Sequence, residues 1–211
     1  CGGDGDDWSQ DWNQKISKII KGNMDALCLH MYAQKSMEGK KHNNKDVYYA
    51  TVGAVKKYEE ILNESYKIVN QHVDKNISLA VTEYNLGTIV DSYREQTLEA
   101  AIFNAGMLNM FIRNSNKLTM CNYSDLVNGW PGGCIVSKNG KAFGTASYYV
   151  LKLYSESEIK TVLDVIVDSP AYSTKETIGN IEPLSDVPMV DAVAGINSLD
   201  QKVLFIVNRS F

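Results

Sequence analysis

Residues 77–85, ISLAVTEYN, give the clearest indication of the fold. The stretch begins as a short apolar run of strand-forming residues and ends in a carboxylate, an aromatic ring and an amide, Glu83, Tyr84 and Asn85. A short apolar run that follows a long helical pattern is typical of a buried parallel strand. Because open α/β sheets and β/α barrels bind ligands at the C-terminal ends of such strands, Glu83 is a candidate site residue. The spacing fits a solvated residue at the start of a loop equally well.

Helices and two further strands surround this stretch in a regular order. Residues 46–73 and 94–113 carry apolar side chains at helical spacing, and residues 10–21 form a shorter helical pattern. Short strand-like runs occupy residues 26–32 and 118–122. This alternation predicts βαβ units with a parallel sheet, and therefore an α/β fold.

The three expected strands all end in polar or aromatic residues. The first ends in His30 and Tyr32, the second in Glu83, and the third in Asn122, which Tyr123 follows. In a β/α barrel the C-terminal ends of the strands share one face, and that face carries the active site. We therefore expect these side chains to lie together, although His30 taken alone fits a buried core histidine better than a ligand.

The pattern changes in the last quarter of the chain. Residues 161–168, 189–197 and 202–208 alternate between apolar and polar residues without a helical stripe. Such alternation predicts antiparallel strands with one face on a core and one in solvent. We expect these strands to begin an antiparallel β-sandwich.

Composition narrows the range of partners and cofactors. The 211 residues are 44% hydrophobic and 22% charged, with a formal net charge of -4 and no block of like charges, so we expect no nucleic-acid partner. No apolar run approaches the roughly 20 residues that span a membrane, so we expect no membrane partner. No Cys or His cluster has the spacing of a zinc site, and we expect neither a metal nor another cofactor.

The four cysteines are widely spaced along the chain. Cys28 and Cys121 each lie in a strand-like run, where a buried free thiol is the expected role. Free thiols favour a reducing compartment, so we expect a cytoplasmic protein. The chain starts at Cys1, which fits either the mature end of a lipoprotein or the interior of a longer protein.

A carboxylate near His and Tyr suits the nucleophile of a covalent glycosidase, because both side chains can keep it ionised and oriented. A retaining glycosidase also needs a second carboxyl group about 5–5.5 Å away, which protonates the leaving oxygen. The candidates for this second group are poor, because they flank a loop or lie in a helix. They are Glu38, Asp46, Glu64, Glu95 and Glu99.

Four segments together resemble family 51 of the glycoside hydrolases, most of which are α-L-arabinofuranosidases. They are residues 30–32 (HMY), 81–85 (VTEYN), 120–130 (MCNYSDLVNGW) and 145–154 (TASYYVLKLY), in the order and spacing of the family. The resemblance implies a (β/α)8 TIM barrel followed by a β-sandwich. It also implies a retaining mechanism with two glutamates.

The resemblance implies a role for each candidate residue. Glu83 is the nucleophile, and His30 and Tyr32 line the subsite that holds the arabinose, with Tyr32 hydrogen-bonded near the nucleophile. Asn128 and Trp130 fall where the last barrel loop of the family reaches the sugar. The acid/base of the family lies in a Gly-Asn-Glu segment, which this sequence lacks.

These implications define the protein that we expect. Residues 1–157 are the C-terminal portion of a catalytic barrel and residues 158–211 are part of the β-sandwich, so the chain is an internal fragment. Its parent releases terminal α-L-arabinofuranosyl residues from arabinoxylan or arabinan, and homo-oligomers are common in the family. The fragment alone is expected to be inactive, because the leaving oxygen is not protonated. Two alternatives stay open. The protein could be another barrel glycosidase such as an endo-β-glucanase, or it could be a non-catalytic carbohydrate-binding protein.

Overall fold

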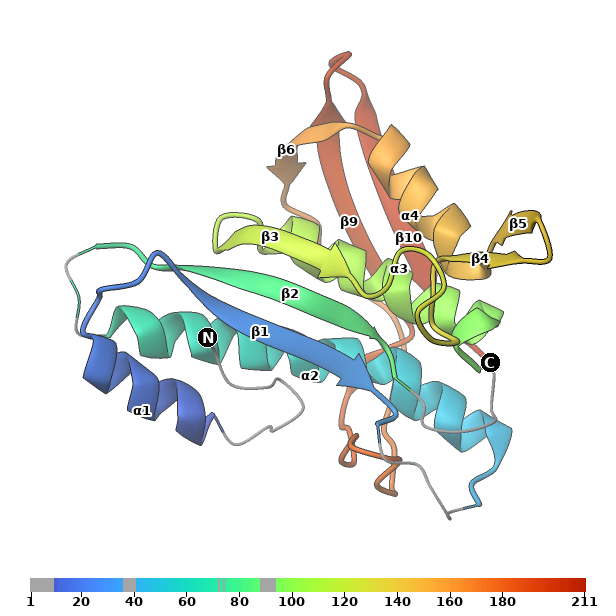
Figure 1. Cartoon of the computed structure of the whole chain (residues 1–211), viewed down its shortest axis with the longest axis horizontal. Helices are drawn as coiled ribbons and strands as arrows, with labels where there is room; N and C mark the ends of the chain where they lie inside the picture. The colour runs from blue at the N-terminus through green and yellow to red at the C-terminus, as the bar shows by residue number, and fades with distance from the viewer. Residues whose placement is uncertain (1–9, 36–40, 72, 74, 88–93) are drawn as a thin grey trace.

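A parallel sheet of three strands forms the first part of the structure (Figure 1). The strands are β1 (Ala26–Ala33), β2 (Ser78–Leu86) and β3 (Leu118–Tyr123), and they lie side by side in chain order. Parallel strands in this order are the arrangement of a β/α barrel, and the prediction of an α/β fold is confirmed. The computed structural model describes residues 10–35, 41–71, 73, 75–87 and 94–211.

The helices lie close to their predicted ranges. They are α1 (Asp11–Ile20), α2 (Asn44–Asn70) and α3 (Leu98–Arg113), and a separate short helix, η1 (Arg94–Gln96), occupies the first turn predicted for α3. The helix α2 begins after Asn43, whose side chain accepts a hydrogen bond from the backbone of Asp46 and caps the helix. In the part of the chain that the structure describes, no helix is long and apolar enough to cross a membrane.

The helices α2 and α3 cover one face of the parallel sheet, and Figure 1 shows α2 running behind β1 and β2. Leu27, Leu29 and Met31 alternate along β1, are fully buried, and belong to the core that the sheet shares with the helices. The residues between them, including His30 and Tyr32, are partly exposed. The candidate site residues of β1 therefore lie on the face that the helices do not cover.

A hairpin that the sequence analysis did not predict follows β3. It consists of β4 (Ile135–Lys138) and β5 (Lys141–Gly144), and the helix α4 (Ala146–Glu156) comes directly after it. Asn139 and Gly140 form the turn with φ values of 53° and 72°. Asn-Gly is the residue pair that two-residue hairpin turns favour, because both positions need a positive φ.

A second sheet, which is antiparallel as predicted, completes the fold. Its order is β10-β9-β6, with β6 at Ile159–Leu163, β9 at Val190–Asn197 and β10 at Lys202–Asn208. The prediction of a strand over residues 161–168 was wrong beyond Leu163. The ladder between β6 and β9 ends there, and Ile166 is 98% exposed, so the apolar run continues without a neighbouring strand.

Much of the segment that joins β6 to β9 packs against the parallel sheet and its helices. It contains the short paired strands β7 (Ala171–Tyr172) and β8 (Val187–Pro188). Ile178, Ile181 and Leu184 from this segment join the main core. Because one core extends across residue 157, the division into two domains at that point stays a prediction.

Candidate active site

Glu83 reaches the open face of the sheet because β2 contains a bulge. The strands β1 and β2 pair Leu29 with Val81 and then His30 with Glu83, so Thr82 is an extra residue in β2. Strict alternation would turn Glu83 toward the helices, on the side of Val81. β-Bulges re-aim side chains in this way next to active sites. The bulge therefore places Glu83 and His30 on the same face.

Two side chains of β1 contact the Glu83 carboxylate. The Tyr32 hydroxyl donates a hydrogen bond to Glu83 Oε2 at 2.7 Å. His30 Nδ1 lies 3.6 Å from the same oxygen, which is too long for a good hydrogen bond but allows an ion pair when the imidazole is protonated. The side chains of His30 and Glu83 are 39% and 44% exposed, so solvent reaches the pair. The structure thus brings together three predicted site residues.

Tyr32 is held in place from several directions. Its backbone carbonyl accepts hydrogen bonds from the Tyr58 hydroxyl and from Asn180 Nδ2, both at 2.7 Å. A Cβ at position 87 would come within 3.0 Å of its ring, so Gly87 leaves room for the ring. Burial, with the nearby Glu83 charge, raises the pKa of Tyr32 above its ordinary value. Tyr32 therefore remains a neutral hydrogen-bond donor at neutral pH.

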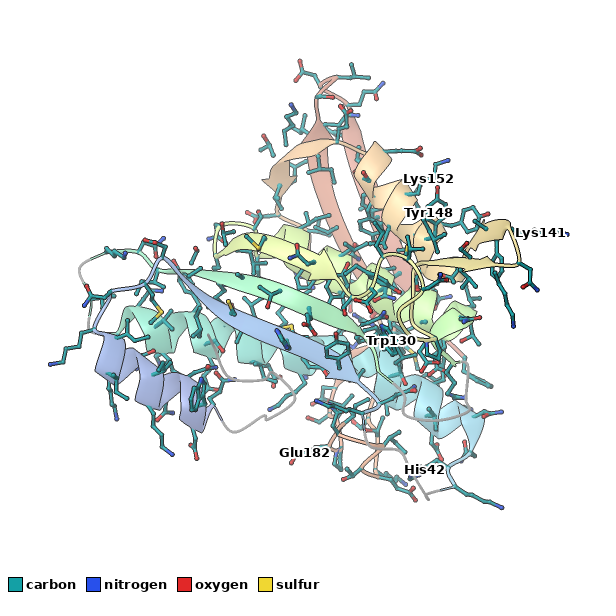
Figure 2. All side chains as sticks on the ribbon, in the orientation of Figure 1. His42, Trp130, Lys141, Tyr148, Lys152 and Glu182 are labelled. Atoms are coloured by element: carbon teal, nitrogen blue, oxygen red, sulfur yellow. The ribbon has the colours of Figure 1, made fainter. Side chains whose placement is uncertain are left out.

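Trp130 joins this group from the loop after β3, and Figure 2 shows it near the C-terminal ends of β1 and β2. Its ring packs edge-to-face on the ring of Tyr32, with centroids 6.2 Å apart and an interplanar angle of 67°. Four of the five predicted site residues therefore form one contiguous cluster.

Asn128 has a different environment from the other four predicted residues. It has a φ of 50°, a left-handed conformation that Asn tolerates better than most residues. Its Oδ1 accepts a hydrogen bond from the backbone of Ser137 at 2.8 Å, and its own N–H donates to the carbonyl of Ile135 at 2.9 Å. These contacts join the loop to the β4–β5 hairpin, and a role of Asn128 in sugar binding stays a prediction.

The structure gives two of the weak acid/base candidates contacts within the fold. Glu99 lies 3.0 Å from Arg94 and accepts a hydrogen bond from Thr51, and burial outweighs these contacts and raises its pKa. Glu95 is only 2% exposed. Glu99 therefore fastens the start of α3, whereas Glu95 is buried in η1.

The remaining candidates for the second carboxyl group are not placed beside Glu83 by any described contact. Asp46 and Glu64 are exposed on α2, and Glu38 lies outside the described residues. Asp125, to which the sequence analysis gave no role, lies close enough to Tyr32 for its charge to raise the pKa of Tyr32. Among the described residues, no group of three His, Cys, Asp or Glu side chains could hold a metal ion.

Two of the cysteines, Cys28 and Cys121, belong to the parallel sheet. Cys28 and Cys121 lie in β1 and β3 as free thiols, and they are partly rather than fully buried. Burial raises the pKa of Cys121 to about 12. A thiol with so high a pKa is a poor nucleophile at neutral pH, so Cys121 has a packing role.

Two features of the site could not be found by reasoning from the sequence. The bulge at Thr82 has no residue signature, because Thr is common in regular strands. Asn180, which supports Tyr32, lies 148 residues away in the chain, and only the folded structure brings it close. Asn85 is a third such residue, because the sequence predicted no role for it although it is fully buried near the end of β2.

Comparison with known proteins matches the chain to a family by sequence and to solved structures by fold. Residues 69–207 match the family described as the alpha-L-arabinofuranosidase C-terminal domain. An intracellular exo-alpha-L-arabinofuranosidase from Bacteroides ovatus is 28% identical over 203 residues, which cover 90% of this chain and 38% of that protein. The chain therefore spans about two fifths of the length of this curated relative.

Solved structures share the fold at low sequence identity. A GH51 arabinofuranosidase from Xanthomonas axonopodis pv. citri has a TM-score of 0.79 at 18% identity, over 99% of this chain and 43% of that one. An alpha-L-arabinofuranosidase from Thermotoga maritima, in a complex with arabinose, has a TM-score of 0.76 at 24% identity. The match covers 97% of this chain and 41% of that one. Because the family match covers most of the chain, the protein belongs to the family described as the alpha-L-arabinofuranosidase C-terminal domain, and the solved structures share its fold.

Proposed function

We propose that this chain supplies the nucleophile side of a retaining glycosidase that releases terminal α-L-arabinofuranosyl residues from hemicellulose. Glu83 is the nucleophile in this proposal. The observation that carries it is the 2.7 Å hydrogen bond from the Tyr32 hydroxyl to Glu83 Oε2 at the end of a parallel strand. Family membership supports the choice of sugar.

The proposed reaction has two steps. A Glu83 oxygen forms a bond to the anomeric carbon while the bond from that carbon to the leaving oxygen breaks, and an acid protonates the leaving oxygen. Water then attacks the same carbon, gives its proton to the conjugate base, and releases Glu83, so the configuration is retained. Tyr32 donates to Oε2, which orients the carboxylate and leaves Oε1 to attack.

The acid/base carboxyl group is proposed to come from a segment outside these 211 residues. The sequence contains no Gly-Asn-Glu segment, Glu95 is buried, and Glu99 forms an ion pair with Arg94. The chain also spans only 38% of its curated relative, which leaves ample sequence for a second carboxylate.

The other cluster residues are proposed to form the sugar subsite. His30 is on the same face as Glu83 and can donate to a sugar hydroxyl, while Trp130 offers an apolar ring beside Tyr32. Asn128 is assigned to the same subsite, and its Nδ2 remains the group that could bind sugar, since Oδ1 binds the backbone of Ser137. The substrates are arabinoxylan and arabinan fragments.

Location and assembly belong to the proposal as well. The Bacteroides ovatus relative is named as intracellular, which supports the expectation of a cytoplasmic protein. Assembly of the parent into a homo-oligomer stays a prediction.

The test uses the full-length gene product and an aryl α-L-arabinofuranoside. Replacing Glu83 by Gln removes the nucleophile and keeps the size of the side chain, so kcat should fall roughly 10⁴-fold or more. The matched control is Glu64→Gln, an exposed glutamate of α2, which should leave kcat unchanged. If Glu83→Gln keeps more than a tenth of the activity, Glu83 is not the nucleophile.

A further inference from the structure

The loop that carries Trp130 is fastened at its two ends and folds back on itself. We refer to residues 124–133 as the Trp130 loop. Its first residue, Ser124, donates a backbone hydrogen bond to the carbonyl of Tyr84 at 3.3 Å. Asp125 accepts one from Cys134 N at 3.0 Å. Within the loop, Gly133 N donates to the carbonyl of Trp130 at 3.1 Å, so the backbone on either side of the indole is closed into a tight turn.

Asn85 connects this loop to the strand that carries Glu83. It is fully buried, and it lies two residues after Glu83 in β2. Its Nδ2 donates to the carbonyl of Ser124 at 2.5 Å and to the carbonyl of Gly132 at 2.9 Å. Its Oδ1 accepts a hydrogen bond from Leu86 N at 2.7 Å. The carboxamide thus uses its two donors on the loop and anchors its oxygen in its own strand.

A second buried side chain donates a hydrogen bond to the carbonyl of Gly132 in the Trp130 loop. The hydroxyl of Tyr123 donates to the carbonyl of Gly132 at 2.9 Å, and burial raises the pKa of Tyr123 to about 12, which keeps it a donor. Gln96 Nε2 donates to the neighbouring carbonyl of Pro131 at 3.0 Å. The carbonyl of Gly132 therefore receives two hydrogen bonds, from the ends of β2 and β3.

The position of Gly132 determines where the indole of Trp130 lies. A Cβ on Gly132 would come within 2.4 Å of the Trp130 ring, so the indole rests directly on this glycine. The indole also packs edge-to-face on Tyr32, which donates to Glu83. Contacts therefore run from Asn85 through Gly132 and Trp130 to Tyr32 beside the carboxylate.

We infer that Asn85, together with Tyr123, is a positioning residue that fixes Trp130 as a rigid wall of the sugar subsite. The inference rests on the proposed function, because it explains what holds one wall of the proposed sugar subsite in place. A fixed indole presents a flat apolar surface to the C–H groups of a furanose ring, and holding it in place beforehand avoids an ordering cost when the sugar binds. Neither Asn85 nor Tyr123 needs to touch the sugar.

The test is a double-mutant cycle in the full-length gene product, with an aryl α-L-arabinofuranoside as substrate. Asn85→Ala should lower kcat/KM about 10–100-fold, mostly through a higher KM, because the indole is no longer held. In a Trp130→Ala background, Asn85→Ala should lower kcat/KM less than about threefold, because the indole that Asn85 positions is already absent. Asn109→Ala is the control, because Asn109 is equally buried but binds Asp191 and Tyr154 beside the second sheet.

The outcomes separate this inference from the proposed function. Equal losses of kcat/KM from Asn85→Ala with and without Trp130 would overturn the inference, as would an unchanged KM. If Asn85→Ala does not fold, Tyr123→Phe takes its place, because it removes the other donor to Gly132 and keeps the ring. It should lower kcat/KM by less than Asn85→Ala does, and this loss should likewise shrink in the Trp130→Ala background. Full activity of Glu83→Gln would instead overturn the proposed function, whatever the cycle gives.

Discussion

At the scale of single residues, the site depends on where one carboxylate points. That His30, Tyr32 and Glu83 lie together could be predicted from the sequence, because parallel strands in a barrel bring their C-terminal ends to one face. The sequence did not indicate that Thr82 is bulged, although that extra residue turns Glu83 to the open face. A bulge depends on how the neighbouring strand pairs, and a single strand carries no sign of its partner's register.

The Tyr32 hydroxyl provides the residue-scale prediction. Tyr32→Phe keeps the ring that packs on Trp130 but removes the donor to Glu83 Oε2. A hydrogen bond to a charged group contributes about 1.5–3 kcal/mol, so we expect kcat of the full-length gene product to fall about 10–100-fold. Steady-state kinetics on an aryl arabinofuranoside measure this.

Tyr48→Phe is the matched control, because its hydroxyl donates to the carbonyl of Ser210 on another part of the surface. It should keep wild-type kcat. A Tyr32→Phe enzyme within twofold of wild type would mean that this hydrogen bond does not assist the reaction.

At the scale of elements, the long amphipathic helices and the apolar strands were predicted well, because their periodic patterns extend over many residues. The β4–β5 hairpin was missed although Asn139-Gly140 gave a usable turn signal. The opposite error occurred at residues 164–168, where a run of apolar residues continues past the last paired residue of β6. Strand-forming residues form a strand only where a neighbouring strand is present to pair with them.

Charged side chains join α2, α3 and β9 at one point. Arg113 of α3 donates to both carboxylate oxygens of Glu59 at 3.0 Å and lies 3.2 Å from Asp191 of β9. Burial alone would raise the pKa of Glu59, but the hydrogen bond and charge of Arg113 outweigh it and lower that pKa. This arrangement stabilises the contact between the parallel sheet's helices and the second sheet.

Removing this arginine should weaken the fold. Arg113→Gln removes the cation from Glu59, while Asp191 keeps Arg209 at 3.7 Å. We expect the free energy of unfolding to fall by about 2–3 kcal/mol, less than for a fully buried pair, because the Arg113 side chain is 33% exposed. Urea denaturation measures the change. Lys57→Gln breaks the exposed pair with Glu60 and should cost less than about 0.5 kcal/mol.

The same pair makes stability depend on pH. Because the folded-state pKa of Glu59 is lowered, its contribution is complete above the unfolded pKa of about 4.3 and is lost as the pH falls through the folded value. The difference between wild type and Arg113→Gln should therefore shrink below about pH 4. A difference that stays constant down to pH 3 would contradict this account of the pair.

At the scale of the whole molecule, residues distant in sequence support the site. Asn180 Nδ2 donates to the carbonyl of Tyr32, and Asn180 Oδ1 accepts from Lys35 N at 3.0 Å. The segment that joins β6 to β9 thus fastens the end of β1 beside the candidate nucleophile. Sequence patterns could not predict this, because nothing local to Asn180 indicates that it contacts a strand at the other end of the chain.

The open face of the parallel sheet gives a whole-molecule prediction. Met120 in β3 is 48% exposed and Leu126 in the Trp130 loop is 62% exposed, and β1 and β3 are the edges of their three-stranded sheet. Exposed edges and apolar faces promote association between copies. We expect the isolated 211-residue chain to self-associate and to be inactive, which light scattering and an aryl arabinofuranoside assay can check. A stable, active monomer would contradict this expectation.

The measurement that tests the central claim most directly is to locate the covalent intermediate. The full-length gene product would be incubated with a slowly turning over arabinofuranosyl reagent, denatured, digested and examined by peptide mass spectrometry. The account predicts one added arabinofuranosyl group on the peptide that contains Glu83, and none in Glu83→Gln. A label on a different carboxylate, or a label that persists in Glu83→Gln, would contradict it.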